Sequence, residues 1–361
     1  MGDLAGNVTL DTGNGESNSQ TVAVQYRERF KKFSGKIYLP RFAVFNGVAG
    51  WRELKHTDIA GKINWLDADL KAFDSLVLTE AGKSQTFAVG LSDDVNEIVE
   101  VHAQKSEYYQ AAAVDLLLIA KNIQDIVPNP WLAWELSKKA VDNLGKRYKQ
   151  PLIAANIVFV IEELAKLLQA EENRLAEAVF RKMISDDMIR LFLAEGIGYC
   201  VPDKTFAKTG ARRLTRGDGS QLERSLFEYV PQDGLNDLEI PVALYLDEHD
   251  KLLWWFRNLA RREYSVRGWQ RNAIYPDFVF AQTDPARVED YEKVYVVETK
   301  GVHLKNEDTD YKQAIFRLCN ELVQSDEVHI DEFAGQFSDK KPVFEVVFGD
   351  EWKRKLNGAL S

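Results

Sequence analysis

Between residues 236 and 348 the hydrophobic pattern changes its period in a definite order. A segment with helical spacing is followed by three short strand-like runs, a second helical segment and a last strand-like run. In sequence order these are Asn236–Glu248, Leu252–Arg257, Ile274–Phe280, Val294–Glu298, Asp310–Val323 and Val343–Phe348. Helical and strand patterns mixed in this way predict an α/β domain with the element order αβββαβ.

The residues before this domain fall into three regions. Residues 1–20 are rich in Gly, Asn, Ser and Thr, which predicts a flexible lead-in. Residues 21–102 carry short alternating apolar runs between turn signals, which predicts a β-rich region. Residues 103–199 carry apolar residues at helical spacing, which predicts a helical region, and the α/β domain is assigned to residues 200–361.

Charge and cysteine content narrow the class of protein. The chain has 46 Lys and Arg against 56 Asp and Glu, a net charge of −10, so any site for a polyanion must be local. Cys200 and Cys319 are too far apart for a zinc knuckle or a redox pair, which favours a reducing cytoplasm. The most apolar stretches are shorter than the roughly 20 residues that cross a bilayer, so no membrane partner is expected.

Two neighbouring strand-like runs carry polar residues at their ends. One contains Pro276-Asp277, and the next ends in Glu298-Thr299-Lys300-Gly301. Because side chains alternate along a strand, Glu298 and Lys300 share a face, and a hairpin can bring Asp277 beside them. This arrangement suits phosphodiester hydrolysis. The two carboxylates can hold Mg²⁺ or Mn²⁺, and the lysine can neutralise charge and position the attacking water. The alternative is a surface aspartate and an incidental Glu–Lys pair.

The same part of the chain resembles the PD-(D/E)xK nucleases, above all the nuclease region of type III restriction (Res) subunits and related helicase-nucleases. The resemblance runs from roughly Phe227 to Val323 and is carried by Leu238–Asp247, Trp254–Asn258, Gly268-Trp269, Tyr275–Phe278 and Glu298–Gly301. It implies a restriction-endonuclease-like core in which Asp277 and Glu298 bind the metal. It also implies that Lys300 is the catalytic lysine and that Glu239 is an acidic residue supplied by the first core helix.

Three candidate residues also have ordinary explanations. Glu239 fits an Asn236-x-x-Glu239 capping box as well as a catalytic role. Gln313, on the helix after the third strand, either lies near the scissile phosphate or is simply solvated. His303 follows Lys300 closely enough to line the site, but an isolated surface histidine is the default.

Two basic clusters are the candidate DNA contacts, through phosphates. One cluster precedes the second core strand and consists of Arg257, Arg261, Arg262, Arg267 and Arg271. The other occupies a stretch without an acid and consists of Lys204, Lys208, Arg212, Arg213 and Arg216. The alternative is a solvated charged face. The nearby Trp254, Trp255 and Trp269 are expected in the core rather than as platforms for stacked bases.

Two stretches resemble parts of an ATPase without completing one. Ala81-Gly82-Lys83-Ser84 has Val77 where a phosphate loop needs glycine, and the acidic run Asp247–Asp250 has no phosphate loop upstream. No ATP binding is therefore expected. A motor would have to lie on a missing part of the chain or on a partner.

Together these patterns predict a metal-dependent DNA endonuclease, the nuclease part of a restriction or phage-defence system. Its expected partners are DNA, a helicase or translocase motor, and a methyltransferase or other defence subunits. The alternative from another class is a non-catalytic DNA-binding or assembly module of a helicase-containing defence complex. The complete set of Asp277, Glu298 and Lys300 favours the enzyme.

Overall fold

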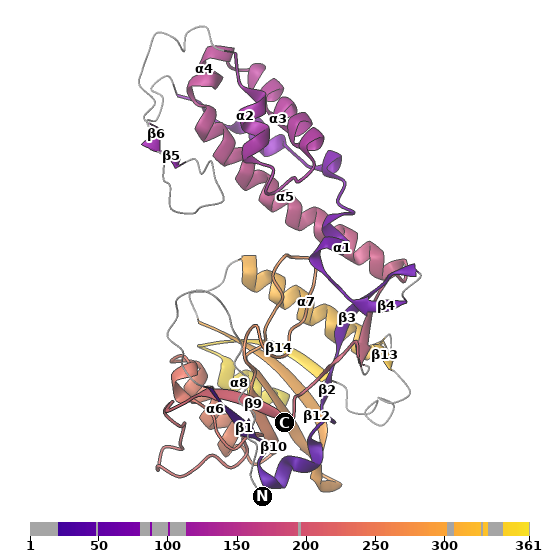
Figure 1. Cartoon of the computed structure of the whole chain (residues 1–361), viewed down its shortest axis with the longest axis vertical. Helices are drawn as coiled ribbons and strands as arrows, with labels where there is room; N and C mark the ends of the chain where they lie inside the picture. Colours follow the sequence, from indigo (N-terminus) through magenta and orange to yellow (C-terminus); the bar gives the residue numbers. More distant parts are fainter. Residues whose placement is uncertain are drawn as a thin grey trace, which may run out of the picture. The chain divides into compact units, whose positions relative to one another are not determined.

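The computed structural model describes residues 21–47, 50–79, 87–88, 100–101, 113–193, 196–301, 307–325, 328–330 and 342–360. They form two compact units, and most of their elements are labelled in Figure 1. The sheet unit is built from the segment that ends at Glu53 and from the segments that begin at Arg190 and Ala273. The helical unit contains Leu54–Ile189 and Arg267–Asn272.

The sheet unit is organised around a mixed four-stranded sheet. Its strands, in spatial order, are β10 (Leu252–Arg257), β11 (Phe278–Asp284), β12 (Arg287–Lys300) and β14 (Pro342–Phe348). β10, β11 and β12 are antiparallel, and β14 is parallel to β12. Apolar side chains on both faces are buried, as expected for a sheet that is covered on both sides.

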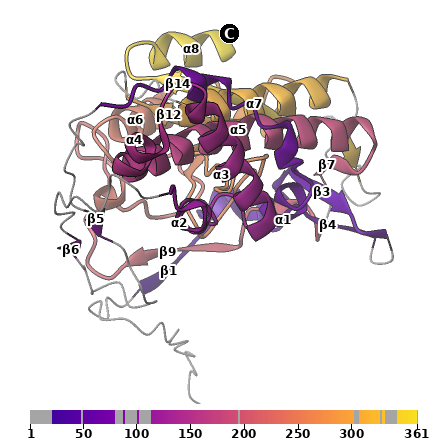
Figure 2. The ribbon, with the colours of Figure 1, turned by 90° about the horizontal axis from the view of Figure 1, so that it is seen from above.

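Three helices belong with this sheet: α6 (Glu239–Glu248), α7 (Glu307–Gln324) and α8 (Trp352–Ala359). On one face, α6 and α8 share a core with Trp255, Phe280 and Tyr295. On the other face, α7 packs on β14, where the rings of Phe316 and Phe344 are 5.4 Å apart. α7 and α8 lie beside β12 and β14 in both views of the ribbon (Figures 1 and 2).

The order α6, β10, β11, β12, α7, β14 is the order that the hydrophobic patterns predict, and the protein is a mixed α/β protein. One short strand, β13 (Val328–Ile330), intervenes between α7 and β14 and joins a different sheet. β11 starts at Phe278 rather than at Ile274, and β12 starts at Arg287 rather than at Val294.

The first strands of the chain also belong to the sheet unit. They are β1 (Thr21–Gln25), β2 (Tyr38–Leu39), β3 (Arg41–Phe45) and β4 (Trp51–Glu53), and they pair among themselves or with β7 (Ile189–Leu193), β8 (Tyr199–Cys200) and β9 (Lys204–Lys208). The units are therefore interleaved along the chain. The sequence predicts consecutive regions, 21–102, 103–199 and 200–361, whereas each observed unit combines segments that are separated along the chain. Residues 1–20 lie outside the described residues.

The helical unit contains α1 (His56–Ala60), α2 (Leu116–Asn122), α3 (Pro130–Gly145), α4 (Gln150–Ala155) and α5 (Ile157–Ser185). The short strands β5 (Phe87–Ala88) and β6 (Glu100–Val101) pair with each other. Local sequence sets the helix starts: the Asn129 side chain accepts from the backbone of Trp131 and Leu132, and Pro130 follows it. In the part of the chain that the structure describes, no helix is long and apolar enough to cross a membrane.

Candidate functional site

Asp277 lies at the end of the four-stranded sheet, immediately before β11. Continuing the register of β11 and β12, in which Phe278 is opposite Val297, places Asp277 opposite Glu298. The Asp277 backbone N–H donates to Val297 O at 2.9 Å. Its Oδ2 accepts from the backbone N and from Oγ1 of Thr299, both at 2.7 Å. The hairpin thus fixes this carboxylate beside the Glu-Thr-Lys run.

Glu298 and Lys300 lie on the face of β12 that α7 covers. Lys300 Nζ is 3.0 Å from Glu298 Oε1, and Lys312 Nζ of α7 is 2.8 Å from the same oxygen. Asp308, one turn earlier on α7, has Oδ2 3.2 Å from Lys312 Nζ and 3.6 Å from Lys300 Nζ. We call Glu298, Lys300, Asp308 and Lys312 the β12–α7 cluster.

Glu239 approaches from the opposite face of the sheet, in the first turn of α6. Its Oε2 accepts from the backbone N of Asn236, and Asn236 Oδ1 accepts from the backbone N of Glu239. The capping interaction expected from the sequence is therefore present. Glu239 Oε1 also accepts from Arg257 Nη2 at 2.8 Å, and this nitrogen is 3.6 Å from Asp277 Oδ1. Arg257 thereby links Glu239 to Asp277, so capping and contact with the site coexist.

Burial and the charge of Asp277 oppose the ionisation of Glu298 and Glu239. Burial raises the pKa of Glu298, and the charge of Asp277 adds to the increase, while Lys312 and Lys300 oppose it. Burial likewise raises the pKa of Glu239, with Arg257 opposing and Asp277 adding to the increase. Burial alone would lower the pKa of Lys312, but the Glu298 carboxylate raises it above the ordinary lysine value. Additional positive charge would therefore be favourable here.

The residues present can be tested as ligands of a divalent cation. The described part of the chain contains no group of three or more His, Cys, Asp and Glu side chains arranged to hold a metal. The pair Asp277 and Glu298 is a smaller set, but Glu298 Oε2 is buried and has no hydrogen-bond partner among the described residues. Leaving a buried charged oxygen without a partner costs free energy. A hard cation held by this oxygen, by Asp277 and by water would supply the partner, so the pair fits Mg²⁺ or Mn²⁺.

Three other residues considered in the sequence do not contribute a described contact to the candidate site. Gln313 is exposed, so the residue that α7 brings to Glu298 is its neighbour Lys312. His303 lies outside the described residues. Cys319 is fully buried, as its place on the apolar face of the helix predicts.

The five arginines expected to contact DNA are divided between the two units. Arg257 forms an ion pair with Glu239. Arg261 and Arg262 are exposed in the sheet unit. Arg267 and Arg271 belong to the helical unit. Of the other basic cluster, Arg216 is paired with the buried Asp247. Trp254, Trp255 and Trp269 are buried, which confirms them as core residues.

Lys312 and Asp308 were missed by the sequence reasoning, although a signal for them exists. Lys312 precedes Ile315 and Phe316 by three and four positions and therefore lies on the apolar face of α7. A charged residue on a buried face needs a partner. Asp308 stands four residues before Lys312, at the spacing of a helical ion pair.

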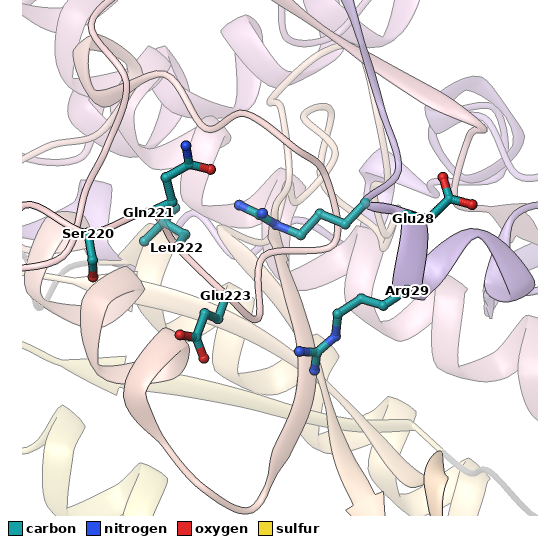
Figure 3. A pocket seen from close by; sticks show the side chains of 7 residues that line it. Glu28, Arg29, Ser220, Gln221, Leu222 and Glu223 are labelled. Carbon is teal, nitrogen blue, oxygen red and sulfur yellow. The ribbon is translucent and has the colours of Figure 1, made fainter.

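A cleft of about 530 Å³ lies elsewhere in the sheet unit. Glu28 and Arg29 come from the 3-10 helix after β1, and Ser220–Glu223 come from a loop on the other side (Figure 3). Its charged lining side chains carry both signs, and none of them belongs to the candidate site. The predicted catalytic residues are thus not in this cleft.

Comparison with known proteins gives no further assignment. No protein-family model, no curated protein and no solved structure matches the chain. Its function is therefore inferred from its own side chains.

Proposed function

We propose that the sheet unit is a metal-dependent endonuclease that hydrolyses phosphodiester bonds of DNA. The observation that carries the proposal is the convergence of Asp277, Glu298 and Lys300 at one end of the β11–β12 hairpin. The order α6, β10, β11, β12, α7, β14 supports the further proposal that this core is restriction-endonuclease-like. The motif resemblance points in the same direction.

In the proposed reaction each side chain has a defined task. Asp277 and Glu298 would hold the divalent cation, which would polarise the phosphate and activate water for attack. Lys300, 3.0 Å from Glu298, orients the attacking water and offsets the charge that develops on the phosphate. Thr299 holds Asp277 through two hydrogen bonds, and Arg257 holds it on the side of Glu239. Water adds to phosphorus, the bond to O3′ breaks, and the products are a 5′-phosphate and a 3′-hydroxyl.

The biological setting is proposed from the resemblance to type III restriction subunits. In that setting the nuclease acts in the cytoplasm as part of a restriction or phage-defence system. A helicase or translocase motor, on a further part of the chain or on a partner, would deliver DNA to it. A methyltransferase or another defence subunit would complete the system.

One observation favours the alternative of a non-catalytic DNA-binding or assembly module. The two carboxylates of the β12–α7 cluster, Glu298 and Asp308, already contact its two ammonium groups, so the cluster is neutral without any ligand. A module that only binds DNA would need no more than this arrangement.

Cleavage assays decide between the two functions. The purified chain is incubated with plasmid, linear and single-stranded DNA in Mg²⁺, in Mn²⁺ and in chelator. We expect nicking that requires the metal, and we expect Asp277→Asn and Glu298→Gln each to lower its rate by at least about 100-fold, because an amide is a poor ligand for a hard cation.

The matched control for these variants is Glu248→Gln. Glu248 is an exposed carboxylate at the end of α6, and its replacement should leave the rate unchanged. Metal-independent DNA binding without cleavage by the unaltered chain would instead support the non-catalytic module.

A further inference from the structure

Lys312 is a largely buried charge on a helix face that otherwise packs in the core. Its side chain is 16% exposed, while Ile315 and Phe316 on the following turn are buried. A lysine placed in this way needs a partner that repays its desolvation. The partner is Glu298, whose side chain is 5% exposed.

The position of Lys312 relative to Glu298 is fixed by the packing of α7. Asn320, two turns later on α7, donates from Nδ2 to Phe344 O at 2.8 Å and accepts from Phe344 N at 2.9 Å. Phe344 lies on β14, which pairs with β12 in a register that sets Val346 beside Glu298. Hydrogen bonds therefore connect α7 to β14 and β14 to β12, which fixes Lys312 of α7 relative to Glu298 of β12.

Both lysines of the β12–α7 cluster contact the same oxygen of Glu298. Lys312 Nζ and Lys300 Nζ are 2.8 and 3.0 Å from Oε1, whereas Oε2 has no partner among the residues described. If Lys300 turns toward a phosphate, Glu298 keeps Lys312 as its counter-ion. Without Lys312, Lys300 would have to serve both as counter-ion of a buried carboxylate and as the group that acts on the substrate.

We propose that Lys312 is a positioning residue that holds Glu298 by Oε1, so that Oε2 is presented to the cation and Lys300 is released for the substrate. This inference rests on the proposed function, whose metal ligands it refines. Lys312 acts through Glu298 and is not assigned a contact with DNA.

A role in positioning and a role in charge balance predict opposite changes in metal affinity. Loss of a residue that orients a metal ligand typically weakens metal binding, by about 10- to 100-fold. If Lys312 only balanced charge, its removal would take away a nearby positive charge and make Mn²⁺ bind more tightly. The direction of the change therefore separates the two roles.

The experiment measures Mn²⁺ binding to the full chain by calorimetry without DNA, together with kcat and KM for plasmid cleavage. Lys312→Met should weaken Mn²⁺ binding by about 10- to 100-fold and lower kcat by a similar factor, with KM for DNA unchanged. Lys312→Arg keeps a cationic donor and should restore most of both. Arg317→Met, on the exposed side of the same helix, is the control and should change neither.

The outcomes distinguish this inference from the function on which it rests. Unchanged or tighter Mn²⁺ binding in Lys312→Met, with a folded protein by circular dichroism, overturns the positioning role while leaving the nuclease proposal in place. A chain that binds Mn²⁺ but does not cut DNA removes the nuclease proposal, and the calorimetry still decides the role of Lys312. Absence of Mn²⁺ binding by the unaltered chain overturns both.

Discussion

Asp247 lies in the last turn of α6 and is fully buried, although it opens the acidic run that resembles a helicase box. Its carboxylate accepts from five donors: the backbone N–H groups of Glu223, Arg224 and Ser225, Trp255 Nε1 and Arg216 Nε. The residue thus ties the loop before α6 to the helix and to β10. These contacts explain the aspartate without any role in nucleotide binding.

This network gives a prediction for stability. Asp247→Asn replaces an acceptor-only group by one that also carries donors, and it removes the charge that pairs with Arg216. We expect a loss of about 3–5 kcal/mol in the free energy of unfolding, the range for breaking a buried ion pair, measured by urea denaturation. Asp250→Asn, three residues later on a fully exposed side chain, should change stability little. Equal effects of the two variants would contradict this account.

Among single residues, the sequence predicts the convergence of Asp277, Glu298 and Lys300 because it depends only on side-chain alternation and on a hairpin. The structure agrees in detail, since the register sets Asp277 opposite Glu298. Lys312 and Arg257 reach the site through the packing of helices against the sheet, α7 on β14 and α6 beside β10. Such contacts have no local signal in the sequence beyond a charge on an apolar face.

For whole elements, the predicted and observed bounds of a strand agree where the local sequence determines where the strand begins and ends. β10 has the predicted bounds, Leu252–Arg257, because its apolar run ends abruptly on both sides. β11 starts later than predicted, because Pro276 has no N–H to give to a ladder. β12 extends back to Arg287 through polar residues, because pairing with β11 compensates for their weak strand pattern.

The long helix α5 shows a similar limit. Leu164, Leu168 and Leu175 share a helical spacing and are buried, but Ala178, which the same spacing places on their face, is exposed. Glu171 is buried instead, because it accepts from the backbone N of Asp69 and from Arg174. A tertiary contact therefore overrides the periodic pattern at this turn.

The contact between α7 and β14 gives a prediction at the level of elements. β14 is an edge strand, and Asn320 satisfies both backbone groups of Phe344 that face away from β12. Asn320→Leu leaves these groups without partners and should lower the free energy of unfolding by about 1–3 kcal/mol. Gln324→Leu, an exposed position one turn later, is the matched control for urea denaturation. Stability equal to that of the control would show that water replaces Asn320 at no cost.

On the scale of the molecule, the sheet unit takes part of its core from the start of the chain. Tyr26, Phe30 and Phe42 are buried in it, and the Tyr26 and Phe227 rings are 4.8 Å apart. Tyr264 donates its hydroxyl hydrogen to Pro40 O at 2.6 Å. β1 and β2 also provide the partners of β9 and β8. The sequence of residues 200–361 does not indicate that their fold needs residues 21–53, because each of these contacts joins segments far apart in sequence.

A fragment of residues 190–361 alone is therefore expected to be incomplete. Removing residues 21–53 leaves β8 and β9 without their partners and leaves β7 paired only with β13. It also exposes the apolar groups around Phe227 and Tyr264. We expect the fragment to lack the cooperative thermal transition of the full chain, as followed by circular dichroism. Adding a separate peptide of residues 21–53 should restore a transition, since the missing contacts are non-covalent. A cooperative transition of the fragment alone, at the temperature of the full chain, would mean that these strands are dispensable and that the C-terminal segment folds as an independent domain.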